Sequence, residues 1–561
     1  MAPTDSSSER QQQGRESVYP VLVLVIVLAV VAGIRLRLLS TPLERDEGEY
    51  AYGGQLLLQG LPLYQNLYTM KWPGTHAVYA LIMAVFGQSP SGIHGGLLIA
   101  NLATSILMFV LARRMGGIWM GVGAAAAQAI LSTNPILLGL AGHATHFVVL
   151  AALAGLCLIL RIEASTSPAR ILAAGVLLGI ATLMKQSGAV FGVFAAGWIA
   201  WQTWISQGRS ASRLFGRLGI LALGGFLPVL VASLAVAWSG GWGVFWLWTA
   251  KYARAYTAER TMVDGWTDLV FTARWTFLSA SGLWILAVAG VVVSCVQTRW
   301  REYRLFCIAL LMCSFLGVCP GWYFRQHYFL LMVPAVALFA GITVEAVHEA
   351  AWRKWQQKTA TLVTALVMAG IISWACFQSR VTFFQKQPEE MWGSDFTPNL
   401  FAEAIPVGEF IRAHSAAGRR IAVLGSEPEL YFYSHRLAAT GNIYMYPLME
   451  RQPYAAQMQE AMIREIERNS PDFVVLVQDP YSWLRQPDSP TLIFQWLDRY
   501  GPSHLRLVAW VEKLANGKAA YHWSRPKGEV VTASPCWLAI YQGVASARGS
   551  LQTPASIPSG H

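Results

Sequence analysis

Three acidic residues stand within four positions directly after the first hydrophobic stretch of the chain: Asp46, Glu47 and Glu49. A positioned carboxylate can take the proton from a hydroxyl group as that hydroxyl attacks a substrate. The same spacing also matches a helix capping box, in which Asp46 caps the helix and Glu49 reaches back to it. Because a cap does not need a second adjacent acid, Glu47 favours the catalytic interpretation.

Cations follow at three later positions, each next to an apolar segment. Lys71 precedes Trp-Pro-Gly, Lys185 and Gln186 separate two apolar runs, and Arg325 and His327 stand in an aromatic turn. Snorkelling to the membrane surface and an aromatic belt would explain these residues without a function. Cations at such positions could instead hold the phosphate of a lipid headgroup.

Two further polar groups have structural interpretations that we favour over functional ones. His143 and His146 are three residues apart and share a helix face, so they are either metal ligands or a hydrogen-bonded helix end. The sequence favours the helix end. The segment 239–275 contains Lys251, Tyr252, Arg254 and Tyr256, which we expect on a solvated or headgroup-facing surface.

The composition indicates a polytopic membrane protein. Of 561 residues, 54% are hydrophobic and only 13% are charged. The net charge of +11 comes from basic residues in short loops between apolar runs, which is typical of topology signals and not of a nucleic-acid partner. Six of the seven cysteines lie in apolar spans and Cys536 stands alone, so the sequence offers no disulfide framework or zinc spacing.

The apolar runs predict eleven membrane spans and a shorter interfacial helix at 75–87. The first span is predicted to be a retained signal anchor with its N-terminus in the cytoplasm. Basic residues mark every second loop, which places the Asp46 loop and everything after about residue 380 outside. The predicted spans are 17–34, 93–112, 117–134, 143–160, 170–185, 187–205, 218–238, 276–297, 305–321, 328–347 and 359–379.

The chain changes character after the last span. The runs RRIAVLGS and PDFVVLVQD predict buried strands, and YAAQMQEAMIREIER between them predicts an amphipathic helix. The predicted fold class is therefore an all-α polytopic membrane protein with a C-terminal extracytoplasmic α/β domain. The expected organisation is a disordered cytoplasmic N-terminus at 1–16, a transmembrane domain at 17–380 with its first outer loop at 40–75, the α/β domain at 381–540 and a flexible tail at 541–561.

Several of these motifs together resemble the membrane-embedded GT-C glycosyltransferases. They are Arg-Asp-Glu after the first span, an aromatic helix, Lys-Trp-Pro-Gly, a Lys-Gln hairpin tip and a late His-Tyr. The branch that they resemble includes the protein O-mannosyltransferases and the lipid A aminoarabinose transferases. The resemblance covers about residues 35–341 and is most specific in the first outer loop. It implies transfer of a sugar from a polyprenyl monophosphate carrier, with inversion, to an acceptor on the outer membrane face.

The resemblance also implies roles for individual residues. Asp46 corresponds to the catalytic carboxylate and Glu47 to its companion. Relatives commonly carry another acid in the second outer loop, but residues 134–146 contain none, which leaves the need for a divalent metal open. No other cofactor is expected. The donor phosphate is assigned to Lys71, Lys185 and Arg325, and substrate binding to Tyr50, Gln186, His327 and Tyr328.

The sequence does not decide whether the acceptor is a glycolipid such as lipid A, an envelope polysaccharide or a protein. The expected location of the enzyme is the inner or plasma membrane. A transporter or flippase for a lipid-linked sugar is the main alternative, and it predicts inverted repeats and helices interrupted at mid-membrane. The sequence shows neither feature. An inactive scaffold, in which Asp46 only caps its helix, is a third alternative.

Overall fold

The computed structural model describes the chain except for residues 1–5, 207–209, 393–398, 515–517, 525–536 and 545–561. Cys536 and most of the predicted tail therefore lie outside the described residues. The chain forms two compact units. Unit 1 contains residues 1–41, 71–238 and 260–388, and unit 2 contains residues 42–70, 239–259 and 389–561.

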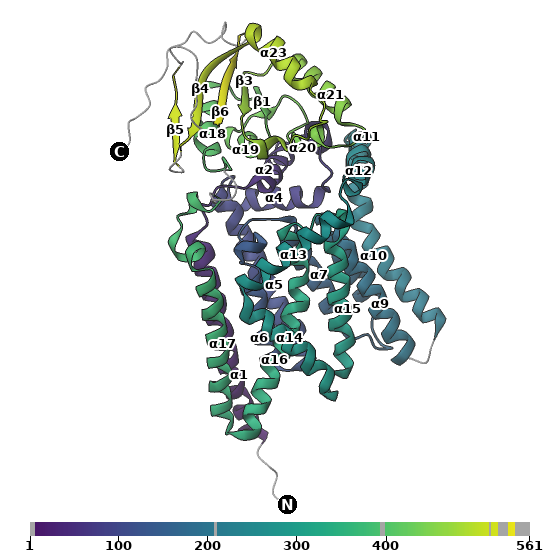
Figure 1. Cartoon of the computed structure of the whole chain (residues 1–561). Coiled ribbons are helices and arrows are strands. Elements are labelled where there is room, and N and C mark those ends of the chain that lie inside the picture. The colour runs from purple at the N-terminus through teal and green to yellow at the C-terminus, as the bar shows by residue number, and fades with distance from the viewer. Residues whose placement is uncertain (1–5, 207–209, 393–398, 515–517, 525–536, 545–561) are drawn as a thin grey trace, which may run out of the picture. The chain divides into compact units, whose positions relative to one another are not determined.

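Unit 1 is a bundle of helices (Figure 1). Helix α16 packs against α6 and α14, α5 packs against α6, and α10 packs against α8. An apolar cluster joins α1, α6, α16 and α17 through residues such as Val27, Val122, Val344 and Met368. The main helices are α1 (Ser6–Arg37), α4 (Pro73–Phe86), α5 (Pro90–Gly116), α6 (Ile118–Leu131), α7 (Ala144–Ile159), α8 (Pro168–Met184), α9 (Ala189–Ser206), α10 (Ala211–Trp238), α13 (Met262–Ser279), α14 (Ser281–Val296), α15 (Arg301–Val318), α16 (Val333–Lys354) and α17 (Gln357–Gln378).

Six helices in the described part of the chain are long and apolar enough to cross a membrane. A seventh crossing results if α13 and α14, which meet at a bend of 102°, are counted as one span. Each of the eleven predicted spans overlaps a helix, but α6, α7 and α8 are shorter than a full crossing. The number of crossings therefore stays a prediction.

Two boundaries differ from the sequence prediction. The single span expected at 276–297 is broken at Ala280, and α13 extends back to Met262. Helix α1 begins at Ser6, inside the segment expected to lack regular structure. The residues there include Glu9, Arg10 and three glutamines, which are good helix formers and can continue a helix from the apolar run.

Unit 2 is built on a six-stranded mixed sheet in the order β2-β1-β3-β6-β4-β5. Strand β1 pairs in parallel with β2 and β3, and the other pairs are antiparallel. Both predicted strands are confirmed as β1 and β3, and the predicted amphipathic helix is confirmed as α21. The elements are β1 (Arg420–Leu424), β2 (Leu437–Ala438), β3 (Phe473–Val477), β4 (Leu505–Lys513), β5 (Ala519–His522), β6 (Trp537–Gly543), α18 (Ala404–His414), α19 (Glu429–Ser434), α20 (Tyr446–Met449), α21 (Ala455–Asn469), α22 (Pro480–Trp483) and α23 (Leu492–His504).

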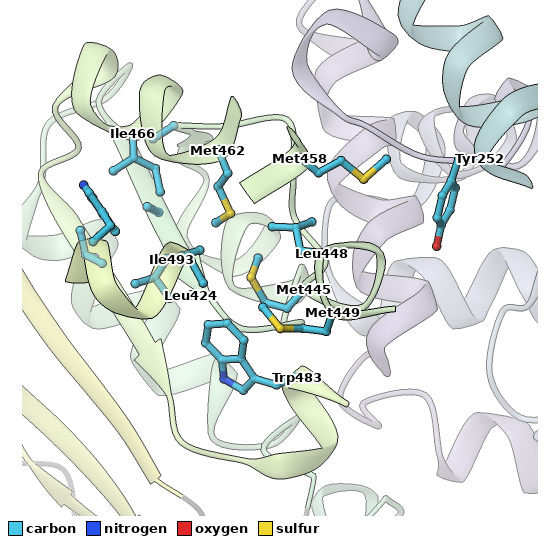
Figure 2. Close-up of a cluster of buried hydrophobic side chains, with 14 of the residues drawn as sticks. Tyr252, Leu424, Met445, Leu448, Met449, Met458, Met462, Ile466, Trp483 and Ile493 are labelled. Atoms are coloured by element: carbon cyan, nitrogen blue, oxygen red, sulfur yellow. The ribbon is translucent and has the colours of Figure 1, made fainter. Parts of the chain in front are cut away.

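The core of unit 2 is rich in methionine (Figure 2). Helix α21 contributes Met458, Met462 and Ile466, and these side chains pack with residues of α20, α22 and α23. Residues 239–259 join the same core through Trp248 and Tyr252. The Tyr252 hydroxyl also donates to Glu450 Oε2 at 2.6 Å. This segment contains α11 (Trp242–Trp246), the π-helical η3 (Leu247–Tyr252) and α12 (Ala253–Ala258).

The segment 42–70, which makes up most of the predicted first outer loop, also belongs to unit 2 and not to the helix bundle of unit 1. It contains α2 (Arg45–Leu58) and α3 (Leu63–Asn66). The loop is bonded to the α/β part along its whole length: Leu43 N donates to the Tyr433 hydroxyl at 2.9 Å, the Tyr52 hydroxyl accepts from Ala438 N at 2.8 Å, and Tyr68 N donates to Gly441 O at 2.7 Å. The C-terminal sheet and its helices therefore support the helix that carries the acids.

Candidate active site

The acids of α2 differ in their roles at the start of the helix. Glu44 is the N-cap, and its side chain accepts from Glu47 N at 3.0 Å. The Glu47 carboxylate accepts in return from Glu44 N at 3.3 Å, which completes a capping box. The predicted capping box of Asp46 and Glu49 is therefore wrong, because the box lies two residues earlier. Glu47 is 0% exposed, whereas Asp46 stays partly exposed in the first helical turn.

The position of Asp46 suits a carboxylate that works in its ionised form. The partial positive charge at a helix N-terminus stabilises a negative side chain in the first turn. The Tyr444 hydroxyl lies 3.4 Å from Asp46 Oδ1 and 2.9 Å from Arg45 O. Asp46 thus combines exposure, a favourable helix position and a neighbouring hydroxyl donor.

Arg45 ties the start of α2 to the loop after β1. Its guanidinium donates to Ser426 O at 2.5 Å and forms an ion pair with Glu427 at 3.1 Å. The other Glu427 oxygen accepts from the Ser482 hydroxyl at 2.7 Å. Burial raises the pKa of Glu427, and Arg45 and the Ser482 hydroxyl oppose this rise. The pair holds Arg45, the residue before Asp46, in a partly buried position.

Glu429 is a second buried acid beside α2. It is 0% exposed, and burial together with the charge of Glu427 raises its pKa well above the usual value. An added Cβ at Gly48 would lie 2.6 Å from Glu429 N, so the glycine allows α2 to approach the start of α19 closely.

Glu49 and Tyr50, two further residues of α2, are buried. Glu49 Oε1 accepts from the Thr69 hydroxyl at 2.5 Å, and Glu49 is buried. Tyr50, which the resemblance assigns to substrate binding, is 4% exposed. Among the assigned residues of this helix, Asp46 is the one that the structure leaves partly accessible.

In unit 1, the structure brings together residues from three distant segments. Lys185 Nζ lies 3.5 Å from the ring centroid of Tyr328, which favours a cation–π interaction. The rings of His327 and Tyr328 are 4.7 Å apart, and the His143 ring stacks on His327 at 4.0 Å. We call these four residues the lysine–histidine cluster. Gln186 follows Lys185 as the first residue of η2 (Gln186–Gly188) and is partly exposed.

The turn before the cluster has an unusual backbone. Trp322 and Phe324 have φ values of 57° and 40°, in the left-handed region that large side chains rarely adopt. Such residues cost on the order of 1–3 kcal/mol each and gather at functional sites. Helix α13 braces the turn, since the Thr272 hydroxyl donates to Phe324 O at 3.2 Å. No sequence pattern predicts this strain.

Arg325 and Lys71 have different surroundings. Arg325 is exposed, and its guanidinium lies 5.5 Å from the centroid of the Tyr323 ring. The Lys71 turn packs against the end of α8, because the Thr75 hydroxyl donates to Met184 O at 2.8 Å and a Cβ at Gly74 would lie 2.5 Å from Leu183 O. The segment with Lys71 therefore lies beside the residues that precede Lys185.

The two histidines at the start of α7 have separate partners. His143 is the N-cap residue and stacks on His327, whereas His146 Nδ1 lies 3.1 Å from Asn101 Oδ1. This arrangement favours the hydrogen-bonded helix end over a metal site made by this pair. Imidazole nitrogens such as those of His143 and His327 can bind divalent transition metals.

Comparison with known proteins places this geometry in a known fold. The structure of ArnT from Cupriavidus metallidurans bound to undecaprenyl phosphate matches with a TM-score of 0.57 at 15% identity, over 95% of this chain and 99% of that chain. The archaeal oligosaccharyltransferase AglB from Archaeoglobus fulgidus, in complex with an inhibitory peptide and a dolichol-phosphate, matches with a TM-score of 0.52 at 11% identity. The match covers 91% of this chain and 75% of that chain. The chain has the GT-C fold.

The Archaeoglobus fulgidus oligosaccharyltransferase in complex with Zn and sulfate matches with a TM-score of 0.51 at 13% identity. The match covers 90% of this chain and 74% of that chain. These matches confirm the predicted fold class, a polytopic membrane protein with a C-terminal α/β part. The sequence model of the dolichyl-phosphate-mannose-protein mannosyltransferase family matches residues 71–231. That stretch includes Lys71 and Lys185 but not Asp46. No curated protein sequence gives a significant match.

Proposed function

We propose that this GT-C protein is a glycosyltransferase that moves a sugar from a polyprenyl monophosphate carrier to an acceptor outside the cytoplasm. The observation that carries the proposal is the position of Asp46, a partly exposed carboxylate in the first turn of α2. Its neighbours are less available, because Glu44 forms the N-cap and Glu47 and Glu49 are buried. The fold and the family match at residues 71–231 support the proposal, as do the polyprenyl phosphates named in the solved structures.

Asp46 acts as the general base in this proposal. The acceptor hydroxyl attacks the anomeric carbon of the donor sugar while its proton passes to the Asp46 carboxylate. The bond between the anomeric carbon and the phosphate oxygen breaks, and its electron pair leaves with the polyprenyl phosphate. A single displacement of this kind inverts the configuration at the anomeric carbon. Glu47 supports the helix as part of its capping box and takes no proton.

The leaving phosphate needs cations more than it needs an acid. A phosphate monoester has a second pKa of about 6, so it leaves as a stable anion near neutral pH. The cations assigned to this phosphate are Lys185, Lys71 and Arg325. They donate charge-assisted hydrogen bonds to the phosphate oxygens. Tyr328 orients Lys185 through the contact of the ammonium with its ring. Gln186, His327 and Tyr328 then contact the sugar or the headgroup, whereas the burial of Tyr50 favours a packing role for that residue.

Purified protein in proteoliposomes with radiolabelled polyprenyl monophosphate sugars tests the proposal. We expect label to leave the carrier and enter a lipid, polysaccharide or protein fraction, according to the acceptor supplied. NMR of the product then reports the anomeric configuration. Movement of intact donor across the bilayer without loss of its sugar would contradict the proposal and support the flippase alternative.

The same assay tests a divalent metal. Protein treated with a chelator is compared with untreated protein, and zinc or magnesium is then returned. Loss and recovery of transfer would show that a metal takes part, in addition to the residues assigned above. Such a metal is of interest because a solved structure of similar fold contains Zn.

A further inference from the structure

The C-terminal α/β part of unit 2 places one side chain against the proposed base. Tyr444 stands just before α20, nearly 400 residues after Asp46 in the sequence. Its hydroxyl lies 2.9 Å from Arg45 O and 3.4 Å from Asp46 Oδ1. The single hydroxyl proton is therefore shared between a fixed backbone oxygen and the Asp46 carboxylate.

The elements around this contact are held firmly on both sides. On the α2 side, the Arg45 guanidinium is paired with Glu427 and bonded to Ser426 O. On the other side, Met445 N donates to the Ser426 hydroxyl at 2.9 Å. The residue next to Tyr444 and the residue next to Asp46 thus bind to the same serine, which fixes the spacing between the two segments.

The hydroxyl of Tyr444 keeps its proton under working conditions. Burial raises the pKa of Tyr444 well above its usual value, and the negative charges of Glu49, Asp46 and Glu44 raise it further. The phenol therefore stays a donor, and it can accompany the Asp46 carboxylate without ionising.

We propose that Tyr444 is a positioning residue that orients the Asp46 carboxylate for proton removal, so that the C-terminal part of the chain completes the catalytic apparatus. This inference rests on the proposed function of Asp46 as the base. A base must be held close to its productive geometry, and a bond from a rigid neighbouring element restricts the rotation of a short side chain. Tyr444 itself takes no proton from the acceptor.

The test compares Tyr444→Phe with Tyr446→Phe. Tyr446 stands two residues later, and its hydroxyl donates to Tyr481 O of α22 at 2.9 Å. We expect Tyr444→Phe to lower kcat about tenfold, because the loss of one hydrogen bond to a charged group changes a rate by about this factor. The KM for the donor should not rise. Tyr446→Phe should leave kcat and KM within about twofold of the wild-type values, because the hydrogen bond that it removes is to a neutral backbone oxygen.

A double variant shows whether Tyr444 acts through Asp46. If it does, adding Tyr444→Phe to Asp46→Asn causes no further loss of transfer, because the group that the hydroxyl orients is already disabled. Independent losses that multiply in the double variant would overturn the proposal. An unchanged kcat in Tyr444→Phe would overturn it as well.

Chemical labelling gives a readout that does not depend on activity. A carbodiimide labels accessible carboxyl groups, and mass spectrometry measures the modification of Asp46 at a fixed pH. We expect faster labelling of Asp46 in Tyr444→Phe and the wild-type rate in Tyr446→Phe. Equal rates in all three proteins would overturn the proposal. Absence of transfer by the wild type would instead refute the proposed function, and labelling would still decide whether Tyr444 holds Asp46.

Discussion

At the residue scale, Asp46, Glu47 and Glu49 show how neighbouring carboxylates acquire different chemistry. Glu47 is buried and bonded to the N-cap, and Glu49 accepts a hydrogen bond from Thr69. Asp46 remains partly exposed in the first helical turn. The acidic run alone predicts the place of a base, but the helix start decides which acid is available.

A substitution of Lys185 tests the assigned phosphate site. Lys185→Ala removes the cation that Tyr328 orients, so we expect the KM for the polyprenyl phosphate donor to rise about tenfold or more, as for a lost charged hydrogen bond. The control is Lys358→Ala, an exposed lysine in the first turn of α17. Steady-state kinetics with varied donor measures the effect, and equal KM values in the two variants would count against a role for Lys185.

Glu429 makes the stability of unit 2 depend on pH. Because its pKa is raised in the folded protein, its contribution is fully present below the usual value of 4.5 and is lost as the pH rises through the folded-state pKa. Glu427, Glu44 and Arg45 are the charged groups that act on it. Glu429→Gln cannot ionise, so its melting temperature should exceed that of wild type by an amount that grows as the pH is raised from 4.5 towards the folded-state pKa of Glu429. A constant difference across this range, measured by thermal unfolding, would contradict the assignment.

The capping box illustrates what the sequence could not supply at this scale. Asp46 is a favoured N-cap residue with an acid three positions later, whereas Glu44, which is not among the favoured caps, takes the position instead. Arg45 accounts for the difference in physical terms. Its contacts with Ser426 and Glu427 fix the chain before Asp46, and residues so distant in sequence give no local signal.

At the scale of elements, helix α2 depends on close packing against α19. Gly48 permits the approach, since an added Cβ would come within 2.6 Å of Glu429 N and 2.9 Å of Glu429 Cα. A backbone atom cannot move aside as a flexible side chain can. The contact therefore sets the position of the helix that carries Asp46.

Gly48→Ala should destabilise unit 2 by about 1–3 kcal/mol through overpacking, and it should lower transfer because α2 must shift. The control is Gly501→Ala in α23, where the nearest atom to an added Cβ is Leu497 Cδ1 at 3.9 Å. Thermal unfolding and transfer are measured for both variants. A Gly48→Ala protein as stable and active as the control would show that the helix has room to adjust.

Some elements could be predicted from the sequence, but the elements that they pack against could not. Hydrophobic patterns located β1, β3 and α21 and an apolar helix at each expected span. They could not show that residues 42–70 and 239–259 fold with the C-terminal part, because such packing joins segments hundreds of residues apart. The strained backbone at Trp322 and Phe324 also gave no sequence signal, since neither residue type favours a positive φ.

At the scale of the whole molecule, the proposed function depends on one orientation of the protein in the membrane. The distribution of basic loops predicts a cytoplasmic N-terminus and a C-terminal part on the outer side. The residues of unit 2 all fall in segments that this topology places outside. This topology therefore predicts that the proposed chemistry takes place away from the cytoplasm.

Cysteine labelling in intact cells tests this orientation. In a cysteine-free background, Gln495→Cys in α23 should react with a membrane-impermeant maleimide, because residue 495 is exposed and predicted to lie outside. Arg301→Cys, exposed at the start of α15, should react only after the membrane is permeabilised. The reverse pattern would place the C-terminal part in the cytoplasm and contradict the predicted topology.

The most direct test of the central claim is sugar transfer from a polyprenyl monophosphate donor by wild type, Asp46→Asn and Asp498→Asn, at equal amounts of folded protein. Asp498 is an exposed acid of α23 and serves as the matched control. We predict transfer by wild type and Asp498→Asn, and a loss of about 10²–10⁴-fold in Asp46→Asn, the usual contribution of a general base. Transfer by Asp46→Asn at the wild-type rate would show that Asp46 is not the base.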